Sequence, residues 1–206
     1  MLQILSLFRF SRVGLQSFVL PLLLIVLTVT NVEARETYVE YAQRILAKPP
    51  DGVEVREDLE ASVLRATNAY LSSKGLKPLK SANGILLKAA RAQAMDLLLQ
   101  GGMGHVSSNG YNFESRIRAF HQGQMFLAPM AENAARLRNS ALSDSAKAQA
   151  LVQQWVKSSG HRRNMVNRTY MTIAIGVVSR GKDVYAVQIF SGPVVKTNIM
   201  GGQIPN

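Results

Sequence analysis

The chain has 206 residues, no cysteine and a formal charge of +11, from 24 lysines and arginines against 13 aspartates and glutamates. The lack of cysteine excludes stabilisation by disulfides and excludes a lipid anchor attached through cysteine, so stability must come from the burial of apolar side chains. Hydrophobic residues make up 47% of the chain, which predicts a packed core and argues against disorder.

Residues 1–34 have the pattern of a secretory signal peptide. Arg9 and Arg12 precede an apolar run from Val13 to Val29, and Val32-Glu33-Ala34 forms a small-residue cleavage site. Cleavage after Ala34 leaves a secreted or periplasmic chain of 172 residues with 22 basic and 12 acidic side chains. The alternative is an uncleaved inner-membrane anchor, because the apolar run is nearly long enough to span a bilayer.

Residues 35–57 are predicted to form an N-terminal arm and linker. Apolar residues at helical spacing predict a short amphipathic helix between positions 35 and 48, and Pro49-Pro50-Asp51-Gly52 ends it. We expect this arm to be separate from the core, so that deletion of residues 35–52 leaves a folded domain.

Two longer helices are predicted to follow the arm. The first begins at Asp58 as its N-cap and is closed by Gly75. The second extends from Ile85 to Gln100 after a cap within residues 81–83, and Gly101-Gly102 breaks it. This break places His105 on an exposed turn.

The chain then turns at Ser108-Asn109-Gly110, and Asn112 is expected to cap a short helix that carries Arg116 and Phe120. The segment from Met125 to Leu137 is predicted to be extended, because Pro129 excludes a continuous helix.

A further amphipathic helix is predicted from a cap at Ser143 or Asp144 to Trp155, after which residues 161–166 form one more helical turn beginning at His161. From Met171 the apolar period changes to two, with apolar residues on both faces of the strand. A turn at residues 180–183 and a second strand from Val184 to Phe190 complete an antiparallel hairpin.

The expected fold class is therefore α+β: an α/β/α sandwich with a small antiparallel sheet between helices. It occupies residues 58–192, and residues 193–206 form an irregular tail.

The order and spacing of several polar and apolar residues resemble the CAP or SCP superfamily of cysteine-rich secretory proteins, antigen 5 proteins and plant pathogenesis-related proteins. Eukaryotic members are rich in disulfides, so the missing cysteines point to the bacterial branch. The resemblance extends from about Leu64 to Phe190 and rests on Asn68, Gly75-Leu76-Lys77-Pro78-Leu79, His105, Arg116, Glu132-Asn133, Trp155, Ser158-x-Gly160-His161-Arg162-x-Asn164, Gly176 and Gln188-x-Phe190.

The resemblance implies a cavity lined by two histidines and two acidic residues, and three of these positions are His105, Glu132 and His161. The position of the second acid is occupied by Ser158, which carries no charge. The cleft is expected to include these four residues together with Ser107, Asn133 and Asn164.

Three interpretations of this cleft are possible on chemical grounds. His105, His161 and Glu132 together suit a divalent cation such as zinc, although their separations of 27 and 29 residues are unlike a compact zinc motif. Ser107 as nucleophile, with His105 as base and Glu132 as orienter, would suit a hydrolase. The third interpretation is structural: hydrogen-bonded histidines beside a carboxylate that accepts from an imidazole or from backbone amides.

We expect an exported bacterial CAP-domain protein that binds a ligand or partner in the cell envelope through this cleft, with no demonstrated catalysis. The alternative is an envelope hydrolase acting on lipid, peptide or cell wall, and a third class is a rigid interaction platform. A lipid, a cell-wall polymer or a protein is the expected ligand, with anionic surfaces as further partners. No nucleic-acid partner is expected, because basic and aromatic residues do not interleave.

Overall fold

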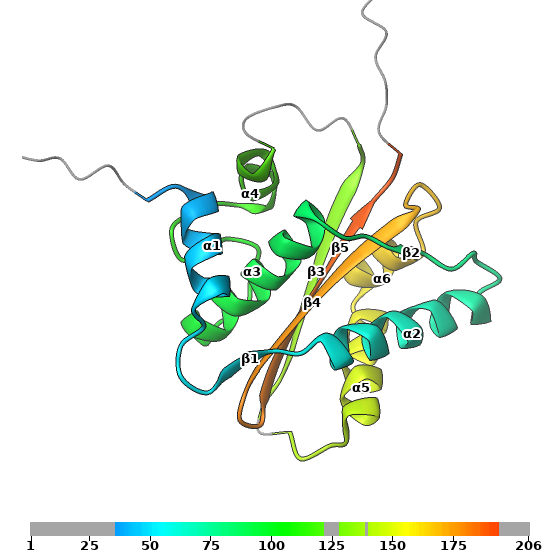
Figure 1. The fold of residues 1–206 in the computed structure, drawn as a ribbon. Helices are drawn as coiled ribbons and strands as arrows, with labels where there is room; N and C mark the ends of the chain where they lie inside the picture. Colours follow the sequence, from blue (N-terminus) through cyan, green and yellow to red (C-terminus); the bar gives the residue numbers. More distant parts are fainter. Residues whose placement is uncertain (1–35, 122–127, 139, 194–206) are drawn as a thin grey trace, which may run out of the picture. The chain divides into compact units, whose positions relative to one another are not determined.

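The computed structural model describes residues 36–121, 128–138 and 140–193 (Figure 1). From Arg35 onward the chain forms one compact unit. The predicted signal peptide and all but the first residue of the predicted tail lie outside the described residues. Among the residues that are described, no helix is both long and apolar enough to cross a membrane.

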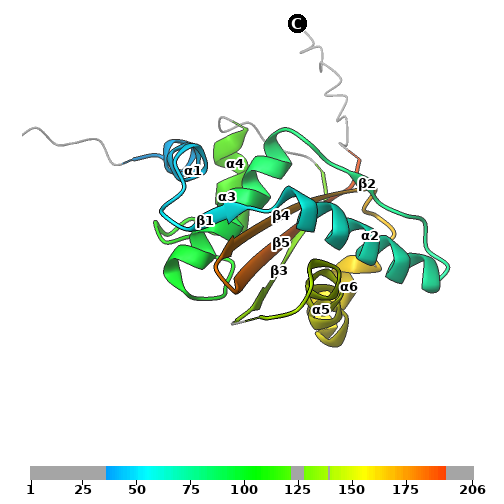
Figure 2. The ribbon, with the colours of Figure 1, turned by 60° about the horizontal axis from the view of Figure 1, so that its bottom comes forward.

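A five-stranded sheet lies between two layers of helices, as Figures 1 and 2 show. One layer contains α1 (Tyr38–Ala47), α3 (Ile85–Gln100) and α4 (Phe113–Phe120), and the other contains α2 (Glu57–Ser73), α5 (Asp144–Lys157) and α6 (Ser159–Met165). The strands are β1 (Val53–Val55), β2 (Lys80–Ser81), β3 (Met130–Leu137), β4 (Thr172–Arg180) and β5 (Asp183–Ser191). The predicted α+β sandwich is confirmed.

The sheet has the order β1-β4-β5-β3, which makes β3 a terminal strand. Strands β4 and β5 form the predicted antiparallel hairpin, in which Arg180 pairs with Asp183 across the turn. The short strand β2 also pairs with β4 but runs parallel to it, so the sheet is not wholly antiparallel as expected.

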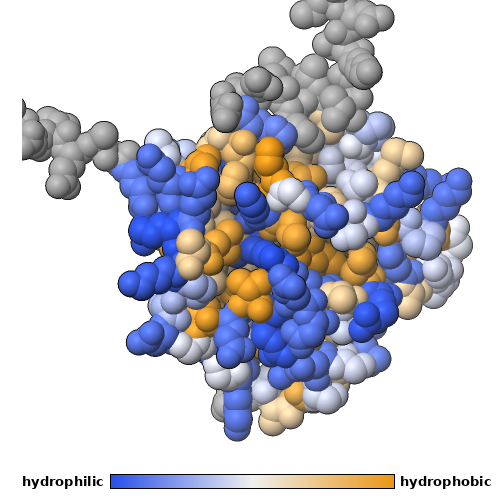
Figure 3. Space-filling model, viewed as in Figure 1, coloured by the Kyte–Doolittle hydropathy of each residue, from blue (hydrophilic) through white to orange (hydrophobic). Residues whose placement is uncertain are grey.

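Both faces of the central hairpin are buried, as the unbroken apolar period predicts. Ile173 and Ile175 belong to the core shared with α2 and α5, whereas Ala174 and Val178 belong to the core shared with α3. Gly176 lies where α3 touches β4 directly, since an added Cβ would lie 2.3 Å from the backbone nitrogen of Arg91. On the face seen in Figure 3, hydrophilic side chains dominate the periphery and hydrophobic side chains are exposed mainly in the middle.

The start of two helices differs from the predicted caps. The N-cap of α2 lies two residues earlier, at Arg56, which makes no side-chain cap bond. Asp58 instead binds the Arg56 guanidinium from within the first turn. Helix α3 begins after Gly84 at a positive φ of 62°, because residues 80 and 81 are already paired in β2. Asn112 and Ser143 cap α4 and α5 as predicted.

The N-terminal arm is packed into the domain. The predicted helix is present as α1, but Tyr38 and Ala42 are completely buried against Ala92 of α3. Strand β1, at the end of the same segment, pairs with β4. Helix α1 and strand β1 thus contact the helical layer and the sheet, which argues against a separate arm, and the deletion experiment decides whether the domain folds without residues 35–52.

Candidate functional site

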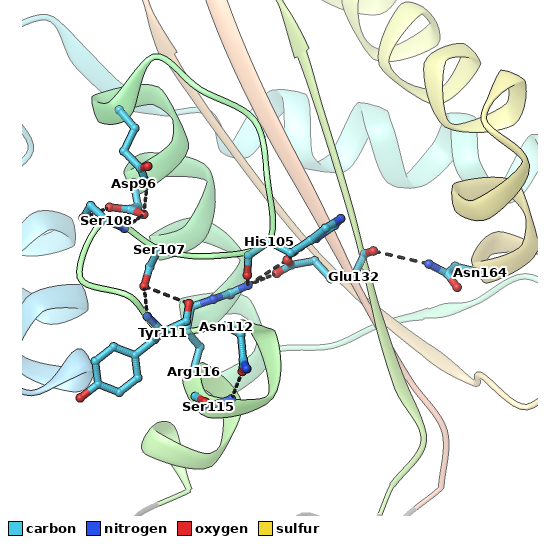
Figure 4. Close-up of polar contacts among 11 residues, drawn as sticks. Asp96, His105, Ser107, Ser108, Tyr111, Asn112, Ser115, Arg116, Glu132 and Asn164 are labelled. Atoms are coloured by element: carbon cyan, nitrogen blue, oxygen red, sulfur yellow. Dashed lines mark hydrogen bonds and ion pairs between the residues drawn. The ribbon is translucent and has the colours of Figure 1, made fainter.

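The structure brings together the two histidines and the glutamate that were expected to share a cleft. His105 Nδ1 lies 2.9 Å from Oε1 of Glu132, and the rings of His105 and His161 are 6.4 Å apart between centroids, at an interplanar angle of 68°. Figure 4 shows His105 and Glu132 meeting between the loop after α3 and strand β3. Residues far apart in sequence thus form one polar cluster at the terminal strand.

Strand β3 positions both sides of this cluster, because successive side chains of a strand point to opposite faces. Glu132 faces the layer that holds His105 and α4, while the next residue, Asn133, faces α6 and donates to the carbonyl of His161 at 3.1 Å. The cluster therefore lies around the edge of the sheet, with one histidine supplied from each layer.

The partner of Glu132 that sequence reasoning missed is Arg116 of α4. Its Nη2 donates to both carboxylate oxygens at 2.8 Å, and it also lies 3.4 Å from the carbonyl of His105. The side chains of Arg116 and Glu132 are 0% and 1% exposed. Arg116 was recognised as part of the motif, but nothing in the sequence connects it to an acid on a strand sixteen residues away.

The two imidazoles have different electrostatic environments. The hydrogen bond to Glu132 is the main reason that the pKa of His105 is raised, while burial and the Arg116 charge oppose it. Burial, followed by the charge of His105, lowers the pKa of His161. In mildly acidic solution, the cluster therefore favours a protonated His105 beside a neutral His161. Because His105 is 51% exposed and Glu132 is buried, the histidine presents this charge to solvent.

The predicted zinc ligands do not fit a metal site in this arrangement. Within residues 36–121, 128–138 and 140–193, no three His, Cys, Asp or Glu side chains are grouped so as to hold a metal ion. Both oxygens of Glu132 accept from Arg116, so a cation bound to Glu132 would lie close to a guanidinium. The prediction of a three-ligand metal centre is not supported by this geometry.

Neither serine of the predicted cleft is placed as a nucleophile: Ser107 is bonded within a turn and Ser158 is at the start of a helix. Ser107 is buried, its hydroxyl lies 2.6 Å from Oδ1 of Asn109, and it accepts from the N–H of Tyr111 at 3.0 Å. It stabilises the turn, and the described contacts include no hydrogen bond from Ser107 to His105. Ser158 occupies the N-cap position of α6 and makes no side-chain cap bond. The nucleophile arrangement proposed from the sequence is therefore not formed.

The two asparagines of the predicted cleft belong to a chain of hydrogen bonds that extends from half-buried Asn164 into the core. Nδ2 of Asn164 donates to Oδ1 of Asn133 at 2.9 Å, and Nδ2 of Asn133 donates to Oε1 of Gln188 at 3.1 Å. Gln188 in turn donates to the hydroxyl of Thr67 at 2.9 Å. This chain fixes α6, and with it His161, to the sheet and to α2. The role of Thr67 was not predicted, because the sequence does not distinguish a buried threonine in a helix from an exposed one.

Comparison with known proteins decides the family. Residues 64–190 match the profile of CAP, the cysteine-rich secretory protein family, and this range contains every residue of the cluster. The chain belongs to the CAP family. Helix α1 and strand β1 lie before the matched range of this CAP protein.

Several bacterial proteins resemble this CAP protein. It is 28% identical over 122 residues to the uncharacterized protein YkwD of Bacillus subtilis, across 59% of this chain and 43% of YkwD, so it spans less than half of that relative. An outer surface protein of Borrelia burgdorferi has a similar structure with a TM-score of 0.55 and 15% identity, over 68% of this chain and 96% of that one.

An extracellular protein of Bacillus anthracis that contains an SCP domain has a TM-score of 0.53 and 21% identity, over 66% of this chain and 41% of that one. At these identities, the two structures support the shared fold alone.

Proposed function

We propose that this CAP protein is exported and binds an acidic ligand of the cell envelope through the exposed edge of His105. The observation that carries the proposal is the contact between half-exposed His105 and buried Glu132. Since Nδ1 of the ring faces Glu132, Nε2 is the nitrogen left for a ligand. A protonated imidazole is a donor at both nitrogens, which suits a carboxylate or phosphate acceptor.

The surroundings of the cluster support an acidic ligand. Arg162 and Arg163 follow His161 directly and are exposed, and the chain after the predicted cleavage site carries a formal charge of +10. A positive surface attracts anionic partners over a distance of about 8–10 Å at moderate salt. Carboxylates and phosphates are present in cell-wall polymers and in anionic lipids, so either is a suitable ligand class.

Export is proposed from the pattern of residues 1–34, and two proteins that share the fold are described as an extracellular protein and an outer surface protein. The prediction of cleavage after Ala34 is tested by sequencing the N-terminus of the protein recovered from envelope and medium fractions. We expect Arg35 to be the first residue, whereas Met1 on membrane-associated protein would support the uncleaved anchor.

The geometry favours binding over hydrolysis. In the arrangement expected from the sequence, His105 would be the base for Ser107, but the described contacts include no hydrogen bond between them and the hydroxyl of Ser107 is held in a turn. The position expected for a second acid is Ser158. A hydrolase therefore remains the second candidate, to be decided by assay.

The test uses the compact unit from Arg35 onward, vesicles of phosphatidylglycerol or of phosphatidylcholine, and purified peptidoglycan, at pH 6 and pH 8. We expect binding to at least one acidic probe, stronger at pH 6, and weakened by about tenfold in His105→Ala, the change that corresponds to about 1.4 kcal/mol. His121→Ala replaces the only histidine outside the cluster and serves as the control. Equal binding by His105→Ala and wild type would contradict the proposal, and turnover abolished by Ser107→Ala would establish the hydrolase.

A further inference from the structure

A second polar cluster lies behind the loop that carries His105. Its centre is Asp96 of α3, which is completely buried. The carboxylate accepts from the backbone N–H of Ser108 at 2.8 Å, from the Ser108 hydroxyl at 2.6 Å and from Nε2 of Gln100 at 2.6 Å. The hydroxyl of Tyr41 in α1 also donates to Asp96 and lies 3.0 Å from the Ser108 hydroxyl.

This carboxylate depends on its hydrogen-bond donors, because a buried charge without compensation is strongly unfavourable. None of the ion pairs found among the described residues includes Asp96. Neutral donors therefore carry the whole compensation, and three of the four come from Tyr41 and Ser108. Asp96 thus joins helix α1 to the loop, beside the direct approach of the Tyr41 and Ser108 hydroxyls.

The turn from Val106 to Asn112 transmits this anchoring to His105. Val106 pairs with Asn112 across the turn, Ser107 N–H donates to the carbonyl of Tyr111, and Gly110 N–H donates to the carbonyl of Ser107. These bonds close the turn into one unit. Ser108 lies in it three residues after His105, so holding Ser108 in place restricts the position of His105.

Helix α1 contacts the same turn at a second point. The buried ring of Tyr38 packs on the ring of Tyr111 at 5.3 Å and meets Phe120 of α4 edge-on at 5.6 Å. Aromatic pairs at these distances are attractive beyond the area they bury. The arm therefore holds the turn through one polar contact and one aromatic contact.

We propose that Tyr41 and Asp96 are positioning residues of the ligand site, which hold the loop of residues 101–112 where His105 meets Glu132. The ligand-binding consequence rests on the proposed function, but the position of His105 is measured without any ligand. An element outside the matched CAP range thus sets the geometry of the site inside it.

The experiment compares Tyr41→Phe, Ser108→Ala and the matched control Tyr70→Phe on α2, which lies in the opposite layer. Hydrogen exchange of the Ser108 amide reports local opening of the loop. Exchange of the Leu79 amide, which donates to Oδ1 of Asn68 at 2.9 Å, reports opening of the other layer. We expect Tyr41→Phe to accelerate exchange at Ser108 by about tenfold or more, as loss of a hydrogen bond to a charged group implies, and to leave Leu79 unchanged.

The second readout is the NMR titration of the His105 ring. When the loop is released, the pKa of His105 should fall from its raised value towards that of a free histidine, in both Tyr41→Phe and Ser108→Ala. Binding of phosphatidylglycerol vesicles at pH 6 should weaken several-fold in parallel. If wild type does not bind the vesicles but the His105 titration still shifts, vesicle binding is rejected and the positioning role stands. Equal acceleration at Ser108 and Leu79, or an unshifted His105 titration in Tyr41→Phe, would overturn the positioning role.

Discussion

The buried ion pair between Arg116 and Glu132 provides the sharpest prediction for stability. Replacing Arg116 by methionine keeps most of the side-chain volume but leaves the Glu132 carboxylate, which is 1% exposed, without its guanidinium. Removal of one partner from a buried ion pair costs about 3–5 kcal/mol. Folded domains are stable by only about 5–15 kcal/mol, so this is a large share of the total.

For a domain of this size, 1 kcal/mol corresponds to about 2–4 °C in Tm, so Arg116→Met should melt about 6–20 °C below wild type. The control is Arg118→Met on the same helix, which removes an exposed ion pair with Glu114 and should cost less than about 1 kcal/mol. Thermal denaturation followed by circular dichroism measures the change in Tm, and urea denaturation at the same pH and salt concentration measures the change in unfolding free energy.

The double variant Arg116→Met/Glu132→Leu should be more stable than Arg116→Met alone. Nε and Nη1 of Arg116 are buried without a hydrogen-bond partner among the described residues, so burial of the pair is only partly compensated. Replacing both partners should therefore recover at least half of the stability lost in Arg116→Met. A loss below about 1 kcal/mol in Arg116→Met, or a double variant whose loss equals the sum of the single losses, would refute this account of the pair.

Three further predictions test the packing and the titration of the domain. Gly176→Ala should lower the unfolding free energy by about 1–3 kcal/mol or more, because the new Cβ meets the α3 backbone. The control Gly160→Ala, which has open space around it in α6, should be neutral or stabilising, and chemical denaturation measures both changes. Deletion of residues 35–52 should abolish or sharply lower the cooperative thermal transition, and an unchanged Tm would show that α1 is dispensable. The pKa of His105 is raised, so its stabilising contribution is present below about pH 6.5 and is lost as the pH rises through the folded value; His105→Asn should therefore cost more stability at pH 6 than at pH 8.5. The pKa of His161 is lowered, so His161→Asn should cost less stability at pH 6 than at pH 8.5. Urea titrations at both pH values measure each difference.

The periodic elements could be predicted from the sequence because their signals are local. Residues 85–100 form one helix with the predicted bounds, since good helix formers end at a glycine that adopts the left-handed conformation. The β4–β5 hairpin was equally clear, because its apolar residues leave no polar face. The caps of α2 and α3 were not predictable. Asp58 forms an ion pair with Arg56 in place of capping α2, and residues 80–81 pair with the distant strand β4.

The cluster at β3 shows where sequence reasoning stops. The resemblance to CAP proteins predicted the positions of His105, Glu132 and His161. The chemistry of the cluster, however, depends on which side chain pairs with the Glu132 carboxylate. Arg116 does so from another element, and this removes the carboxylate from the predicted metal centre. Asp96 was missed as well, because its burial depends on the packing of α1 against α3, which the sequence did not predict.

The central claim, that His105 presents its free ring nitrogen to an acidic envelope ligand, is tested most directly by the histidine ring signals during binding. Soluble peptidoglycan fragments or phosphatidylglycerol bicelles are added to the compact unit at pH 6, and the three histidines are followed by NMR. We predict that the His105 signals shift in proportion to the bound fraction and that those of His121 do not. Saturable binding that leaves the His105 signals unchanged would contradict the claim.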